Sequence, residues 1–115
     1  MTSIEGVEYE HKPWGSELLF ALTDKYAGKI ITVNKGHRLS LQYHEKKEET
    51  MYVLSGLGKI TTEDSIKSIT EGDVIYITPR TKHRVEAITT LKIVEVSTPE
   101  LSDVVRIADD YGRTK

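Results

Sequence analysis

Four residues in the middle of the chain have side chains of the kinds that hold metal ions: Gln42, His44, Glu49 and His83. In a β-strand, residues two apart point to the same face, so Gln42 and His44 are expected to project together. Segment 45–48 allows the chain to turn back and bring Glu49 beside them, and a later strand adds His83. Two imidazoles, a carboxylate and an amide oxygen suit one divalent cation with open positions for a substrate.

The metal itself is not specified by this donor set. The chain has no cysteine, so no thiolate selects among Mn(II), Fe(II), Co(II), Ni(II) and Zn(II). With one carboxylate and three neutral ligands, the site keeps about one formal positive charge, which favours an anionic, oxygen-rich substrate or an enediolate intermediate. We therefore expect one divalent metal ion per chain and a small anionic ligand.

Two basic residues are expected to share the interior with these donors. Arg38 lies four residues before Gln42, so strict alternation places it on the same face, where its guanidinium fork matches a phosphate group. Lys29 is expected to place one ammonium group in the cavity and is the candidate catalytic base. Residues 45–48 are expected to form a solvated turn.

Short segments rich in β-branched and aromatic residues position these side chains, and helical periodicity is nearly absent. The expected strands are 17–22, 26–33, 38–44, 50–54, 59–62, 74–77, 84–88 and 91–96. Turns rich in Gly, Pro, Asn and Asp separate them, as in a β-sandwich or barrel. After Pro99, Ser102 or Asp103 is a possible N-cap, so residues 104–107 are expected to form one short helix.

The strand predicted over 38–44 is polar on the face of Gln42 and apolar on the face of Leu39, Leu41 and Tyr43. A barrel with a ligand in its lumen and another element or subunit over its outer surface has this pattern. A second copy of the chain would cover both the apolar face and an open strand edge. We therefore expect a homodimer.

Length and composition exclude several classes. The 115 residues form one expected domain, 1–115, and 16 basic against 18 acidic residues give a net charge of −2. This balance argues against nucleic acid or an anionic membrane as partner. No secretory signal or membrane-spanning apolar run is visible, so a soluble cytoplasmic protein is expected.

The order of these residues resembles the two motifs of the cupin superfamily. Gly36, Gln42, His44, Glu49 and Gly56 keep the spacing of the first motif, with Gln in place of its first His. Segment 72–77, a Pro-containing turn and His83 resemble the second. Within the cupins the chain is similar to the type II phosphomannose isomerase domain, through residues 12–16, 39–44, 83–84, 104–106 and 110–113. The expected fold is therefore an all-β, single-domain cupin, a double-stranded β-helix or jelly-roll barrel, with the short C-terminal helix.

The resemblance implies a metal-dependent isomerase that interconverts a phosphorylated aldose and ketose, of the mannose 6-phosphate and fructose 6-phosphate type. Residues 45–51 keep only the Glu of that family's His-rich stretch, and Arg80 replaces the glycine of its Pro-x-Gly turn. These changes lie around the expected cavity mouth, where specificity is set. Two alternatives stay open: another metal-dependent cupin enzyme, such as a different sugar isomerase or a dioxygenase, and a non-catalytic sugar-binding module.

Overall fold

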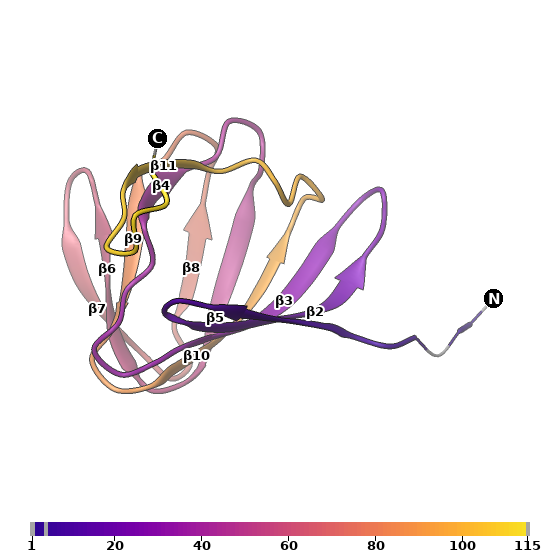
Figure 1. Ribbon diagram of the computed structural model, residues 1–115, viewed down its shortest axis with the longest axis horizontal. Coiled ribbons are helices and arrows are strands. Elements are labelled where there is room, and N and C mark those ends of the chain that lie inside the picture. The colour runs from indigo at the N-terminus through magenta and orange to yellow at the C-terminus, as the bar shows by residue number, and fades with distance from the viewer. Residues whose placement is uncertain (1, 4, 115) are drawn as a thin grey trace.

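The computed structural model describes residues 2–3 and 5–114, which form two facing antiparallel sheets (Figure 1). The first sheet has the order β1 (Glu8–Lys12), β2 (Gly15–Leu22), β3 (Ala27–Val33), β10 (Leu91–Ser97), β5 (Glu49–Ser55) and β8 (Val74–Ile77). The second has the order β11 (Val105–Ala108), β4 (Leu41–Tyr43), β9 (His83–Ala87), β6 (Leu57–Thr62) and β7 (Ile66–Thr70). The all-β fold and its jelly-roll architecture are as predicted.

The space between the sheets is apolar at one end and polar at the other. Along β5, Met51 and Val53 are buried in the hydrophobic core, whereas Glu49 at the start of the strand is buried among polar groups. Along β10, Ile93 belongs to the core and Glu95, two residues later, is a buried acid. Because alternate residues of a strand share a face, the inner face of each strand runs from the hydrophobic core directly into the polar site.

The predicted C-terminal helix is wrong. Residues 105–108 form β11, which pairs antiparallel with β4 at the edge of the second sheet (Figure 1). No helix among residues 2–3 and 5–114 is long and apolar enough to cross a membrane. Two further strands, β1 and β7, also lie outside the predicted set. The chain thus completes its second sheet with the segment that the sequence pattern assigned to a helix.

The strand predicted over 38–44 is regular only at β4, and this changes which side chains face inward. Arg38 is held to Glu86 by a single β-bridge. Leu39 packs against the core rather than facing outward. Strict alternation therefore fails before Ser40, and the expected inward direction of Arg38 is wrong.

Several positions in the cupin-like motifs have backbones that favour glycine, among them positions 56 and 80. Gly56 lies between β5 and β6 with φ 97°, and a Cβ there would be 2.2 Å from the carbonyl oxygen of Thr90. Arg80 has φ 66° in the turn before His83, where the resemblance led us to expect glycine. Arginine thus occupies a left-handed conformation that an L-residue adopts at a cost.

Candidate metal centre

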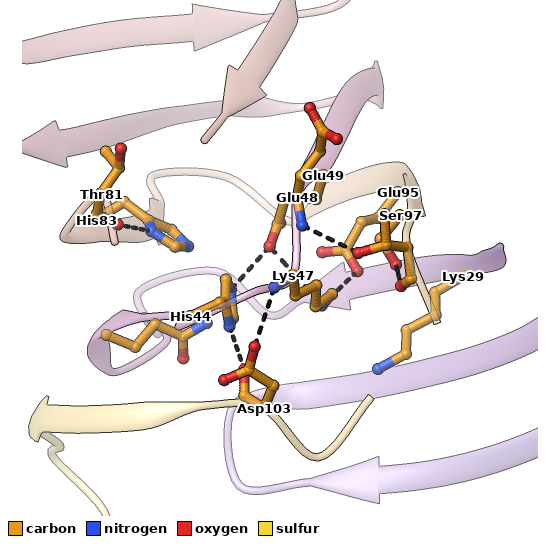
Figure 2. A network of polar contacts seen from close by, with 12 residues as sticks. Lys29, His44, Lys47, Glu48, Glu49, Thr81, His83, Glu95, Ser97 and Asp103 are labelled. Carbon is orange, nitrogen blue, oxygen red and sulfur yellow. Dashed lines mark hydrogen bonds and ion pairs between the residues drawn. The ribbon is translucent and has the colours of Figure 1, made fainter. Parts of the chain in front are cut away.

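Three of the four predicted ligands converge between the sheets (Figure 2). His44 follows β4, Glu49 begins β5 and His83 begins β9. Each is only 3% exposed, and one ligand atom from each lies within 4.8 Å of the others. One of these separations, 2.8 Å, joins His44 Nε2 to Glu49 Oε1. The three side chains therefore surround a volume of the size that one ion occupies.

Backbone carbonyls orient both imidazoles. His44 Nδ1 lies 2.6 Å from the carbonyl oxygen of Asp103, and His83 Nδ1 lies 2.8 Å from that of Thr81. Because a carbonyl only accepts, each Nδ1 carries the proton and each Nε2 keeps its lone pair for a metal. Burial lowers the pKa of His83, which favours the neutral form that binds a metal.

Two of the donor atoms fit a cation because they have no hydrogen-bond partner among the described residues. His44 Nε2 and Glu49 Oε1 are buried, and neither makes a hydrogen bond with any group of residues 2–3 and 5–114, although the two atoms are close together. Buried polar atoms nearly always have a partner. Burial opposes ionisation of Glu49, but contacts with His44 and Glu95 and the charge of Lys47 outweigh it and hold the Glu49 pKa below its usual range. The carboxylate is therefore available as an anionic ligand.

Gln42 lies beside this group. It is the cross-strand partner of His83, so both side chains stand on the same face of the second sheet. Its Oε1 accepts a hydrogen bond of 2.6 Å from Ser40 Oγ. An amide oxygen has two lone pairs, so this bond leaves one for a metal. Gln42 thus shares a face with His83, and its role as the fourth ligand stays a prediction.

A cavity of about 100 Å³, open to solvent, extends from Gln42 and His44. Lys29 lines it, as the strand pattern predicted, and its Nζ lies 2.8 Å from Glu17 Oε1. Both side chains are largely buried. The basic residues of the lining are Lys12, Lys29, Lys47, Arg106 and Arg113. Positive groups outnumber the acids Glu17 and Glu95 there, so the cavity suits an anionic ligand.

Arg38 is not among the cavity residues. Its guanidinium donates two hydrogen bonds, of 2.7 and 3.1 Å, to the carboxylate of Asp110, which also contacts Arg84. The Arg38 side chain is 41% exposed. The structure therefore does not bring Arg38 to the other predicted site residues.

Two site residues were missed from the sequence: Lys47 and Glu95. The prediction of a solvated turn is wrong for Lys47, which is only 5% exposed. Its Nζ lies 3.2 Å from Glu95 Oε2 and 3.7 Å from Glu49 Oε1 (Figure 2). Burial and the Glu49 charge raise the pKa of Glu95 to about 8. One signal was available, since Glu95 is a single acid on the apolar face of 91–96.

Asp103 fixes the loop between β4 and β5. Its carboxylate accepts hydrogen bonds from the backbone N–H groups of Glu45, Lys46 and Lys47, at 3.0, 2.7 and 2.9 Å. These bonds lower the pKa of Asp103 to about 2. Together with the carbonyl bond to His44, they join the segment before β11 to the loop that carries two site residues.

The sequence of the chain matches a known protein family over most of its length. The family model described as "Mannose-6-phosphate isomerase C-terminal" matches residues 4–109. A mannose-1-phosphate guanylyltransferase of Escherichia coli (strain K12) is 38% identical over 108 residues, which are 90% of this chain and 23% of that protein. The alginate biosynthesis protein AlgA of Pseudomonas aeruginosa is 35% identical over 109 residues, with the same two coverages. The chain thus spans about a quarter of the length of these relatives.

Solved structures support the architecture. An RmlC-like cupin from Shewanella frigidimarina superposes with a TM-score of 0.74 at 19% identity, covering 83% of this chain and 86% of that one. At this identity the likeness shows the fold alone. The two facing sheets therefore form a cupin double-stranded β-helix, as the sequence motifs predicted.

Proposed function

Because this chain belongs to the mannose-6-phosphate isomerase C-terminal family, we propose that it is a metal-dependent isomerase of a phosphorylated sugar. The substrate pair would be of the mannose 6-phosphate and fructose 6-phosphate type. The observation that carries the proposal is the convergence of His44, Glu49 and His83 beside a basic cavity. Two of their donor atoms are buried without a hydrogen bond to any described residue. The proposal does not extend to the activities for which the longer relatives are named.

In this proposal Gln42, His44, Glu49 and His83 hold one Mn, Fe, Co, Ni or Zn ion. When bound, the ion supplies Lewis acidity to the adjacent carbonyl and hydroxyl oxygens of the sugar. Gln42 and His83 project from one sheet and Glu49 from the other. The ligand set therefore spans both sheets, and its geometry depends on how they pack.

Lys29 is the proposed base for the proton transfer. Isomerisation removes the proton from the carbon that bears the hydroxyl group and returns it to the neighbouring carbonyl carbon. The Lys29 Nζ lies 2.8 Å from Glu17 Oε1 in the cavity lining, and the base form that the proposal requires is the neutral amine. The amine then takes the substrate proton and gives it back to the adjacent carbon.

Metal-reconstituted protein tests this function. Protein stripped with chelator and reloaded separately with Mn, Fe, Co, Ni or Zn is assayed with mannose 6-phosphate and fructose 6-phosphate. We expect interconversion that chelator abolishes and one of these metals restores. Absence of turnover with all five removes the proposal. Oxygen uptake with Fe(II) would instead favour a dioxygenase, and stabilisation by sugar phosphate without turnover would favour a binding module.

We extend the proposal to assembly and partners. The partner is a small sugar phosphate, as the basic cavity favours, and the chain acts as a homodimer. The sequence-based reason for the dimer changes, because Leu39 packs inward and β11 pairs with β4. The apolar surface that supports it now lies on the first sheet, where large side chains such as Tyr52, Val74 and Val96 are exposed.

A further inference from the structure

We propose that Arg106 is the residue that binds the anionic group of the substrate, on the strand next to the metal ligands. This inference rests on the proposed function and assigns its phosphate subsite. It also replaces Arg38, which sequence alternation had suggested for that role. Three observations support it: the position of Arg106 in the second sheet, the pairing of the other basic groups in the cavity, and its own lack of a partner.

The register of the second sheet places Arg106 beside the metal ligands. Arg106 on β11 is directly opposite Gln42 on β4, and Gln42 is directly opposite His83 on β9. Residues directly opposite each other in antiparallel strands point to the same side. Neighbouring strands are about 4.8 Å apart. Arg106, Gln42 and His83 therefore form a row across the inner face, with Arg106 on the strand next to that of Gln42.

The other four basic residues of the cavity already have carboxylate partners within 4.0 Å. These pairs are Lys12 with Glu10, Lys29 with Glu17, Lys47 with Glu95, and Arg113 with Asp109. Arg106 has no carboxylate within 4.0 Å among the residues that the structure describes; Asp109, the acid that its charge reaches, is bound to Arg113. Arg106 is therefore the basic residue of this lining with the most charge left for a ligand.

The Nε–H of Arg106 also lacks a hydrogen-bond acceptor among the described residues. Its Nε atom is buried, and no group among residues 2–3 and 5–114 accepts a hydrogen bond from it. Burial of an unpaired polar or charged group is costly, so a ligand that supplies the acceptor gains the corresponding energy. A guanidinium presents two parallel N–H groups that match two oxygens of a phosphate. The expected ligand is a phosphate monoester whose metal-binding oxygens lie a few bonds from the phosphate.

Calorimetric titration of metal-loaded protein with inorganic phosphate tests the assignment. We expect Arg106→Gln to weaken phosphate binding at least tenfold while the metal content, measured by elemental analysis, stays that of the wild type. Arg38→Gln is the matched control, since Arg38 pairs with Asp110 outside the cavity, and it should leave the affinity unchanged. Equal phosphate affinity in wild type and folded Arg106→Gln would overturn the assignment, as would equal weakening in the control.

Two further measurements keep the test decisive. If Arg106→Gln does not fold, Arg106→Lys keeps a positive charge but loses the fork, and should still weaken phosphate binding several-fold. For the wild type, phosphate should raise the Tm more than chloride or acetate at equal ionic strength; no difference between phosphate and acetate would overturn a phosphate subsite. Phosphate binding through Arg106 without turnover of mannose 6-phosphate would overturn the proposed isomerase activity but support the phosphate subsite. Turnover of mannose 6-phosphate that Arg106→Gln leaves unchanged would support the isomerase activity but overturn the subsite.

Discussion

Each metal-facing imidazole is oriented by a backbone carbonyl rather than by a side chain. The carbonyl of Asp103 holds His44, and that of Thr81 holds His83. Such contacts outside the ligand set fix the tautomer and the direction of the free nitrogen. A side-chain substitution at 81 or 103 leaves the carbonyl in place, so the ligands themselves are the positions at which substitution should remove the metal.

Replacement of His83 by Ala should lower metal affinity by more than tenfold, because it removes one imidazole ligand from the site and leaves fewer donor atoms to hold the ion. The measurement is the metal content of protein dialysed against limiting Mn or Zn. His11→Ala is the matched control, since His11 is an exposed residue of β1 that contacts Tyr9. Equal metal content in His83→Ala and His11→Ala would contradict the site.

The buried Lys47–Glu95 pair should show strong coupling in a double-mutant cycle. Lys47→Met leaves Glu95 buried without its cation, and loss of one partner from such a pair typically costs about 3–5 kcal/mol. Since the raised pKa of Glu95 eases its protonation, we expect the lower end, about 3 kcal/mol. The double variant with Glu95→Gln should recover at least half of the loss. Urea unfolding of metal-free protein measures these free energies, and purely additive losses would argue against the pair.

At the scale of elements, the turn before β9 contains a strained residue. Arg80 has φ 66°, and its N–H donates to the carbonyl of His44. Glycine adopts this conformation without a steric penalty, although it gains entropy in the unfolded state. We therefore expect Arg80→Gly to raise the free energy of unfolding by about 0.5–1 kcal/mol, measured by urea denaturation. Arg80→Ala, which keeps the Cβ, should show no such gain, and equal effects of the two changes would exclude backbone strain as the cause.

The link between Asp103 and the loop 45–47 should depend on pH. The folded-state pKa of Asp103 is about 2, below the value of about 3.9 for an unfolded chain. The charged carboxylate therefore stabilises the fold above about pH 4, and this contribution is lost as the pH falls from 4 towards 2. We expect the Tm of Asp103→Asn to be lower than that of the wild type at pH 6, with the difference shrinking below pH 4. A difference that is constant from pH 6 to pH 2 would contradict this linkage.

Asp103 also explains why the C-terminal helix was predicted. An acid before an apolar stretch is a common helix N-cap, and Asp103 does accept backbone hydrogen bonds as an N-cap would. Its donors, however, belong to residues 45–47 and not to residues 104–107. Local sequence could identify the acceptor but not a donor segment more than fifty positions away.

The same distinction separates the site residues that could be predicted from those that could not. Gln42, His44, Glu49 and His83 follow from residue type, strand alternation and the cupin-like spacing. Arg38 was misplaced because the chain departs from regular strand geometry before Ser40. Arg106 and Lys47 depend on the register of β11 and on the course of a loop, and these are set by tertiary contacts.

At the scale of the whole molecule, the outer face of the first sheet carries several exposed apolar side chains. Tyr52 is directly opposite Val74 on the neighbouring strand, and Thr50 lies between Val96 and Tyr76. All four of these larger side chains are between 44% and 64% exposed. Contiguous apolar surface on a sheet commonly marks a protein–protein interface. Self-association through this face would bury it symmetrically.

The homodimer is testable through this face. Val96→Glu places a charge within the apolar surface, where burial against a second copy would desolvate it. We expect light scattering to give the mass of a dimer for the wild type at micromolar concentration and of a monomer for Val96→Glu. Ile66→Glu is the matched control, because Ile66 is 68% exposed but lies on β7 of the second sheet. A monomeric wild type would exclude the dimer, and dissociation by Ile66→Glu alone would move the interface to the other sheet. If the dimer forms as expected, the metal site stays accessible, since Gln42, His44 and Glu49 face the opposite, inner side of the fold.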